Sequence, residues 1–400
     1  MKAGWERRRL GELLQKTGTT DPTKEPEKPF SYIDVSSVSN ETFSITETSE
    51  LLGKDAPSRA RRSVRSGDVI FATIRPTLKR VAIVPDELDN AVCSTGYFVL
   101  RGGSKIDNTY LFYWLFSGEF EAEMEARQKG ASYPAVNDSD IRDQYMPVPP
   151  LDEQRRIVAV LDNAFTGIAT ATANAQKNLI NARALFDRYL DQAFGELDGG
   201  WGARTIGDIA AIKGGKRVPK GYKLLNEPTP YPYISVADFS DEGSVEIKKI
   251  RYISGQIFNQ IKRYIIRKED LYVSIAGTVG KTGIVPPELD GASLTENACR
   301  LVFNKGVSNR FVYYFTLTSS FKNQAIEQTR TAAQPKLALS RLQQICLPIP
   351  PQDAQEKLIA TFDDLAGMVR QMEAIYQRKL TALIELKQSL LQKAFAGELT

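Results

Sequence analysis

The second half of this 400-residue chain repeats the first half at an offset of about 200 positions. The segment Met-Pro-Val-Pro-Pro at 146–150 recurs as Leu-Pro-Ile-Pro-Pro at 347–351, and each half ends in Ala-Phe followed by Gly-Glu-Leu, at 193–197 and 394–399. Solenoid repeats have periods of roughly 20–50 residues. A repeat of this length therefore predicts two whole domains, each with its own core.

Shorter matching segments within each half show how the two halves align. The segment Gly-Asp-Val-Ile at 67–70 matches Glu-Asp-Leu-Tyr at 269–272. The aromatic positions align as Leu111, Tyr113 and Trp114 with Phe311, Tyr313 and Tyr314.

Each half also ends in a long helical pattern. Residues 152–194 contain no proline, and apolar residues recur there three or four positions apart, as they do from 358 to 394. A helix of about 43 residues would be roughly 65 Å long. Its apolar stripe needs a partner, so we expect the two helices to pair as an antiparallel coiled coil. The alternative is that each helix folds back on its own domain.

The remaining parts of each half are predicted to be mixed α and β. Short β-branched and aromatic runs bounded by turn residues indicate strands at 69–72, 81–84, 97–100, 271–275 and 299–303. Helices are expected at 108–116 and 308–317. The fold class is therefore α+β: two similar mixed domains, separated by two long antiparallel helices and related by a pseudo-twofold axis.

Clustered basic residues point to a polyanionic partner, although the net charge is only +4. We expect phosphate contacts from basic side chains in both halves, and base or backbone contacts from one arginine and one tyrosine, for each of which the alternative is a surface or packing residue. The phosphate candidates are Arg59, Arg61, Arg62, Lys79 and Arg80 in the first half and Lys213, Lys216, Arg217 and Lys281 in the second. The base or backbone candidates are Arg75 and Tyr133. The alternative for any one cluster is a solvated surface.

The residues for catalysis are missing. The chain has no histidine, which removes the usual general base and every Ser-His triad, and its three cysteines are too few for a four-thiolate zinc site. Gly280-Lys281-Thr282 ends like a phosphate-binding loop, but the position of the first glycine is Ile275. The triplet 246–248 after Asp238 only faintly suggests a nuclease metal site, and no Asn-Pro-Pro-Tyr tetrad or glycine-rich cofactor loop is present. We expect a non-catalytic protein with no cofactor or metal of its own.

These motifs resemble the specificity subunit of type I restriction-modification systems over essentially the whole chain. The resemblance is carried by the two proline junctions with Gln154 and Gln355, the long helices ending in Ala-Phe, the Gly-Asp at 67–68 and the loop Gly-Ala-Ser-Tyr-Pro at 130–134. The second half departs from the family pattern at 269–270 and in the loop 331–335, which lacks the glycine.

The resemblance implies target recognition domains at 1–150 and 198–350 and helical spacers at 151–197 and 351–400. Each domain would read one half of a bipartite site in double-stranded DNA, and the helices would set the spacing. Two modification subunits would dock on the helices and methylate adenine with S-adenosylmethionine. Restriction subunits would add ATP- and Mg-dependent translocation and cleavage.

The composition also bears on where the protein is located in the cell. With 42% apolar and 25% charged residues, no apolar leader and no run long enough to cross a bilayer, the chain is expected to be cytoplasmic, without a membrane partner. Two other functions stay open. One is a coiled-coil scaffold that binds proteins at both ends without DNA, and the other is a self-contained nuclease.

Overall fold

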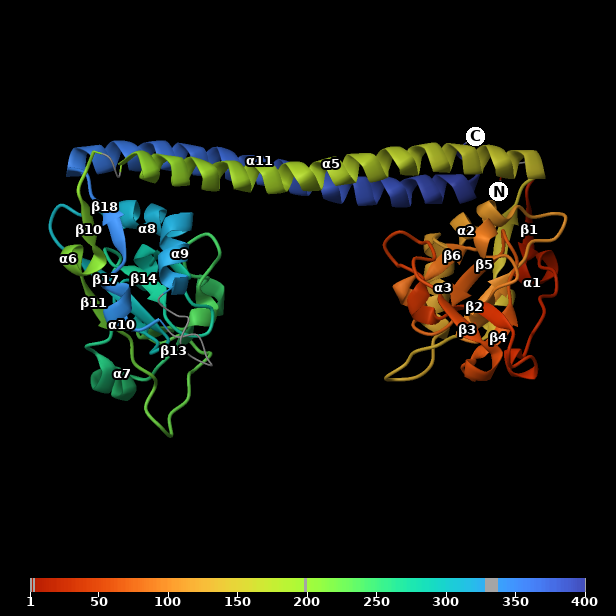
Figure 1. Ribbon diagram of the computed structural model, residues 1–400, viewed down its shortest axis with the longest axis horizontal. Coiled ribbons are helices and arrows are strands. Elements are labelled where there is room, and N and C mark those ends of the chain that lie inside the picture. The colour runs from red at the N-terminus through yellow and green to blue at the C-terminus, as the bar shows by residue number, and fades with distance from the viewer. Residues whose placement is uncertain (1, 3, 198–199, 328–336, 400) are drawn as a thin grey trace. The chain divides into compact units, whose positions relative to one another are not determined.

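The computed structural model describes residues 2, 4–197, 200–327 and 337–399 (Figure 1). The chain divides into two compact units. Unit 1 comprises Met1–Gln176 with Arg378–Thr400, and unit 2 comprises Lys177–Gln377. Each unit therefore contains one globular half of the repeat and a segment of both long helices.

In unit 1 the strands form sheets in the orders β3-β2-β7-β4, β6-β5-β8 and β1-β9. The strands are β1 (Glu6–Arg9), β2 (Pro29–Ile33), β3 (Ser49–Leu52), β4 (Ala60–Ser63), β5 (Val69–Ala72), β6 (Val81–Ile83), β7 (Val92–Ser94), β8 (Tyr97–Leu100) and β9 (Tyr145–Val148). The short helices are α1 (Leu10–Leu13), α2 (Asn108–Trp114), α3 (Gly118–Arg127) and α4 (Asp138–Arg142).

In unit 2 the sheet orders are β11-β17-β14-β15, β13-β12-β16 and β10-β18. The strands are β10 (Ala203–Thr205), β11 (Ala210–Gly214), β12 (Pro232–Ile234), β13 (Arg251–Tyr252), β14 (Leu271–Ser274), β15 (Thr282–Ile284), β16 (Ser293–Leu294), β17 (Ala298–Phe303) and β18 (Cys346–Pro348). The short helices are α6 (Ile206–Ile209), α7 (Gly255–Ile261), α8 (Asn309–Leu317), α9 (Ser319–Glu327) and α10 (Leu339–Leu342).

The two globular folds share one topology, which confirms the predicted fold class. The antiparallel set β6-β5-β8 corresponds to β15-β14-β17, the parallel pair β2-β7 to β12-β16, and the edge pair β1-β9 to β10-β18. Where β11 pairs with β17 in unit 2, unit 1 has only the isolated bridge between Leu14 and Gly102 among its described residues. Helix α7 belongs to unit 2.

The long helices are α5 (Leu151–Leu197, 47 residues) and α11 (Gln352–Ala396, 45 residues), slightly longer than expected. They run antiparallel in both units, because the start of each helix packs against the end of the other. In unit 1 Ile157 and Leu161 share the core with Leu391 and Ala394. In unit 2 Leu190 and Phe194 share it with Ile359 and Phe362.

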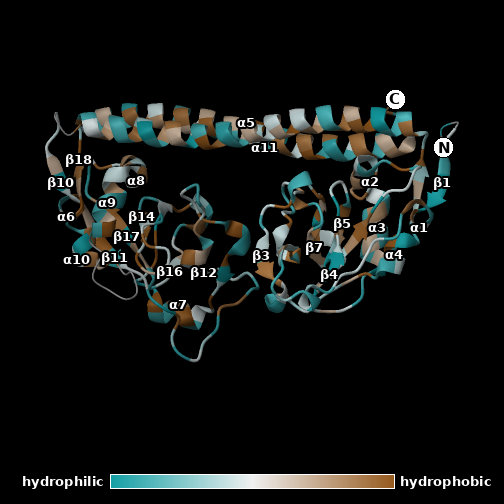
Figure 2. Ribbon diagram, turned by 45° about the vertical axis from the view of Figure 1, so that its right-hand side comes forward, coloured by the Kyte–Doolittle hydropathy of each residue, from teal (hydrophilic) through white to brown (hydrophobic). Residues whose placement is uncertain are grey.

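Both helices are uninterrupted, so neither folds back as a hairpin, and the predicted antiparallel coiled coil is confirmed. Figure 2 shows apolar and polar residues alternating along both of them. No helix in the described part of the chain is apolar over a length that could span a bilayer.

The structure corrects the register of the aromatic segment by one residue. The Tyr113 hydroxyl donates to Asp162 on α5, and the Tyr314 hydroxyl donates to Asp363 on α11 at 2.6 Å. Tyr113 therefore corresponds to Tyr314 and not to Tyr313, at an offset of 201. Adjacent tyrosines allow either alignment in sequence, and the contact with the long helix decides between them.

Candidate nucleic-acid interface

A buried glutamine fixes each long helix to its globular fold in the same way. The Gln154 side-chain oxygen accepts from the Asp107 amide at 2.8 Å, and its nitrogen donates to the carbonyls of Lys105 and Pro149 at 2.9 and 2.8 Å. Gln355 makes the same three bonds, to Ser308, Gly306 and Pro350. Both glutamines are fully buried, so the junction motif in the sequence is a structural anchor.

A second repeated anchor is a buried carboxylate paired with an arginine. Asp68 lies 2.6 Å from Arg101 and accepts from the Arg65 amide, and Asp270 lies 2.5 Å from Arg300 and accepts from the Arg267 amide. The hydrogen bonds that Arg101 donates to Asp68 raise the pKa of Arg101. The sequence matched the two aspartates, but nothing in it identified their arginine partners, which lie 33 and 30 positions further along.

Arg75 and Tyr133, two of the predicted contact residues, are brought together at the surface of unit 1. The Arg75 guanidinium carbon lies 5.0 Å from the centre of the Tyr133 ring, which is 70% exposed. The Arg75 backbone is left-handed, with φ of 50°, and its amide donates to the Pro134 carbonyl at 2.6 Å. A stacked guanidinium keeps its N–H groups along its rim, where they can bond a base edge or a phosphate.

The loop that carries Tyr133 depends on its glycine. Gly130 has φ of 104°, and a Cβ there would meet the Tyr133 carbonyl oxygen at 2.9 Å. The amides and carbonyls of Lys129 and Ala135 bond each other at 2.9 Å and close the loop. The loop is therefore a tight, exposed turn. Its counterpart around 331–335 in the second half lies outside the described residues.

The other predicted residues of unit 1 differ in whether their side chains already have hydrogen-bond or ion-pair partners within the chain. Arg62 makes two bonds to Asp138, at 2.8 and 3.1 Å, and Lys79 lies 2.5 Å from Glu121. Arg80 donates to the Val38 carbonyl at 2.6 Å. Arg61 donates to the Ala60 carbonyl at 2.8 Å, whereas Arg59 is exposed. All five stay predictions, with Arg59 the most accessible.

In unit 2 three predicted residues follow one another along the surface. Lys213 is exposed on β11, and the Lys216 ammonium lies 5.9 Å from the centre of the Tyr264 ring. Arg217 pairs with Glu296, an exposed contact that raises the arginine pKa through its hydrogen bond. Tyr264 and Glu296 were not expected from the sequence, because each lies more than 40 positions from its partner.

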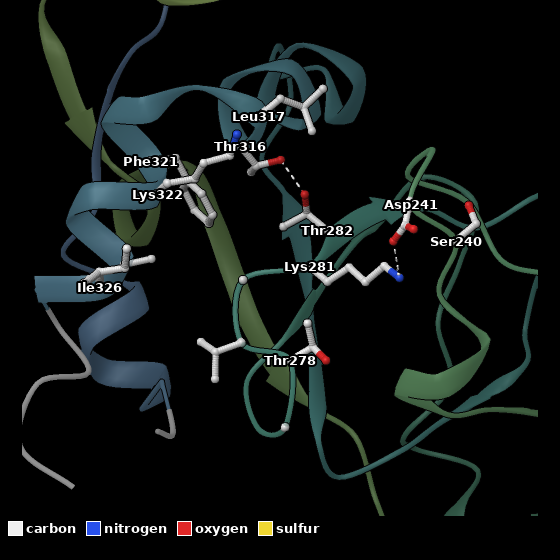
Figure 3. Close-up of a pocket in the computed structure, with 14 residues that line it drawn as sticks. Ser240, Asp241, Thr278, Lys281, Thr282, Thr316, Leu317, Phe321, Lys322 and Ile326 are labelled. Atoms are coloured by element: carbon white, nitrogen blue, oxygen red, sulfur yellow. Dashed lines mark hydrogen bonds and ion pairs between the residues drawn. The ribbon is translucent and has the colours of Figure 1, made fainter. Parts of the chain in front are cut away.

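Lys281 lies at a separate place, beside a groove of about 650 Å³ between the β14–β15 hairpin and α9 (Figure 3). Its ammonium is 2.8 Å from Asp241, and this hydrogen bond lowers the aspartate pKa. The amides of Gly280 and Lys281 are not open to a nucleotide phosphate, because they bond the Ser274 carbonyl and hydroxyl. This geometry agrees with the incomplete phosphate-loop sequence.

The acids that suggested a nuclease site have structural partners. Asp238 is buried and accepts from the Ser235 amide and hydroxyl, and Glu246 lies 2.7 Å from Lys249. Within the described residues, no three cysteine, aspartate or glutamate side chains are grouped closely enough to hold a metal ion.

The chain is similar in sequence to proteins of one known family. Residues 2–182 and 198–378 each match the family described as "Type I restriction modification DNA specificity domain". The chain is 24% identical over 325 residues to the type I restriction enzyme EcoBI specificity subunit of Escherichia coli, covering 73% of this chain and 66%, just under two thirds, of that one. It is 22% identical to the putative MjaX specificity subunit of Methanocaldococcus jannaschii, covering 92% and 88%.

Two solved structures are similar over their whole length. One, from "Structural basis underlying complex assembly and conformational transition of the type I R-M system", is 29% identical with a TM-score of 0.89 and covers 99% of each chain. The other, the HsdS subunit from Thermoanaerobacter tengcongensis, is 29% identical with a TM-score of 0.67 and covers 100% of this chain and 98% of that one.

Proposed function

Since the chain belongs to the family of type I restriction modification DNA specificity domains, we propose that it is a DNA-recognition subunit whose two units each read one half of a bipartite target. The family match extends over both halves of the repeat, and the similar solved structure from a type I system covers nearly the whole chain.

One observation carries the division into two readers. The anchors inside the units are the same: a glutamine at the junction, a tyrosine bonded to the long helix and a buried aspartate paired with arginine. The exposed basic residues are different, with an arginine on Tyr133 in unit 1 and a lysine near Tyr264 in unit 2. Equal scaffolds with unlike exposed residues favour two unlike half-sites.

An unlike pair of half-sites suits a single chain. A symmetric dimer presents the same surface twice and reads a palindrome, whereas two different units in one chain can read an asymmetric sequence. Half-sites about one helical turn apart, roughly 34–36 Å, present the same groove on the same face of the duplex. Basic side chains would supply salt-dependent phosphate contacts, and base edges would supply specificity.

In this function the chain itself makes and breaks no covalent bonds. Helices α5 and α11 set the spacing and dock two modification subunits, which bring S-adenosylmethionine, while restriction subunits bring ATP and Mg. The absence of histidine from the sequence supports this assignment, since histidine is the commonest general base near neutral pH. We propose a cytoplasmic location for this subunit.

Selection from a random duplex library tests this function. The full chain, alone and with a modification subunit, is used to retain fluorescent duplexes with a randomised central region, and the retained pool is sequenced. The expected result is a split, non-palindromic motif with two fixed blocks and an unselected spacer. If neither the chain alone nor the chain with a modification subunit selects a motif, DNA recognition is contradicted and the coiled-coil scaffold is favoured.

A further inference from the structure

Each unit has a groove between a β-hairpin and a short helix. In unit 1 the groove lies between the β5–β6 hairpin and α3, and in unit 2 between the β14–β15 hairpin and α9. The helices are equivalent, because the hydroxyls of Ser117 and Thr318 accept from the amides of Phe120 and Phe321, each at 3.3 Å. Lys322 therefore occupies the position that Glu121 occupies in unit 1.

This exchange reverses the charge of the groove. The unit 1 groove is lined by one lysine, Lys79, and by Glu121 and Glu125, and the lysine is held 2.5 Å from Glu121. The unit 2 groove is lined by Lys281, Lys322 and Asp241, so one acid faces two lysines. Lys281 pairs with Asp241, whereas the exposed Lys322 has no ion pair among the described residues.

The unit 2 groove also has the larger volume, about 650 Å³ against about 230 Å³ in unit 1. Gly277 and Gly280 in its hairpin have φ of 78° and 86°, a conformation that favours glycine, and neither adds a side chain to the groove. In unit 1 the hairpin carries Pro76 and Lys79, both of which line the smaller groove.

The lining of the unit 2 groove combines an apolar wall with a cationic rim. Leu317, Phe321 and Ile326 form the wall, and Thr282 and Thr316 bond each other at 2.6 Å between the two lysines (Figure 3). Because these hydroxyls and the amides of Gly280 and Lys281 are already bonded, the lysine ammonium groups are the charged donors that the groove offers to an anion. An apolar wall beside a lysine fits a sugar with its attached phosphate better than a free phosphate ion.

We infer that this groove binds a sugar–phosphate step of the DNA backbone in the half-site of unit 2, with Lys322 as the phosphate contact. The acidic unit 1 groove binds none. The inference rests on the proposed DNA recognition, and it makes the two units differ in how they hold the backbone as well as in which bases they read.

The salt dependence of binding tests the role of Lys322. Dissociation constants of the full chain for a duplex carrying its selected motif are measured by fluorescence anisotropy over about 0.05–0.2 M salt, where each phosphate contact contributes a slope of about 0.9 in log–log form. Lys322→Ala is expected to reduce the slope by about 0.9 and Lys322→Glu by more. Ethylation interference should lose one phosphate, within one half-site.

Two controls separate this inference from the function it rests on. Lys305→Ala removes an exposed lysine of unit 2 outside the groove and should leave the slope unchanged, and thermal melting of each variant checks its fold. If the wild-type chain binds its motif but Lys322→Ala keeps the full slope and every interference site, the groove does not bind backbone and the proposed function stands. If the wild-type chain selects and binds no duplex, the proposed function itself fails.

Discussion

At the scale of single residues, contacts within the chain hold the backbone and the guanidinium of Arg75 in place. A left-handed backbone at a residue other than glycine costs of the order of 1–3 kcal/mol. The bond from its amide to Pro134 and the stack on Tyr133 offset that cost. The guanidinium is therefore held in one place before any partner arrives, which reduces the entropy lost on binding.

Removing either half of this pair should weaken DNA binding. Arg75→Ala is expected to cost about 1–3 kcal/mol if the guanidinium bonds a base, and Tyr133→Ala less, because the arginine remains but loses its support. Tyr133→Phe keeps the ring and should bind like the wild-type chain. Anisotropy titrations with the selected duplex measure all three, and equal losses for Tyr133→Phe and Tyr133→Ala would contradict the stacking role.

The three cysteines make a separate prediction about burial. Burial raises the pKa of Cys93 and Cys299 to about 12, whereas Cys346 is exposed. In the native chain at pH 8 a thiol reagent should label Cys346 quickly and the other two only after unfolding. A raised pKa means that these thiols favour the folded state below about pH 8.5, their unfolded value, and that this contribution disappears as the pH rises towards 12. Fast labelling of all three thiols in the native chain would contradict the burial of Cys93 and Cys299.

At the scale of elements, the junction glutamines should contribute strongly to the stability of the fold, although glutamine is a residue type that is mostly exposed. Gln154→Ala or Gln355→Ala leaves one amide and two carbonyls without their side-chain partner, and each buried unpaired group costs about 1–3 kcal/mol. A loss of several kcal/mol in unfolding free energy is expected by chemical denaturation. The exposed Gln176→Ala and Gln371→Ala are matched controls and should change little. Equal small effects for all four would show that the anchors are dispensable.

The elements themselves were largely predictable from the sequence, because they follow from local patterns. Proline junctions bounded the long helices, and three- and four-residue spacing gave their apolar faces. The strands at 69–72 and 97–100 were predicted with the bounds that β5 and β8 have. The aromatic register was wrong by one, because a contact with the long helix, 49 residues away, decides it.

The candidate interface was less predictable, because ion pairs join residues that are distant in sequence. Arg62 and its partner Asp138 are 76 positions apart, so a basic run in the sequence could not show which of its side chains are already paired. Lys322 was missed for another reason. It stands alone in its segment, and only its equivalence with Glu121 in the other unit makes it informative.

At the scale of the whole molecule, one fold is used twice with different surfaces. The repeated anchors hold each globular fold to the same kind of helix, so residues at the exposed loops can change in one unit without a change in the other. Under the proposed function, this independence would allow two half-sites of unrelated sequence, and it predicts that damage to one interface stays within one half-site.

Hydroxyl-radical footprinting on the selected duplex measures this most directly. The unit 1 variant Arg75→Ala/Tyr133→Ala and the unit 2 variant Lys216→Ala/Arg217→Ala are each compared with the wild-type chain at saturating protein. We predict that the first variant weakens protection over one block of the motif and the second over the other block. Loss of protection over the same block in both variants, or over both blocks in either one, would contradict the assignment of one half-site to each unit.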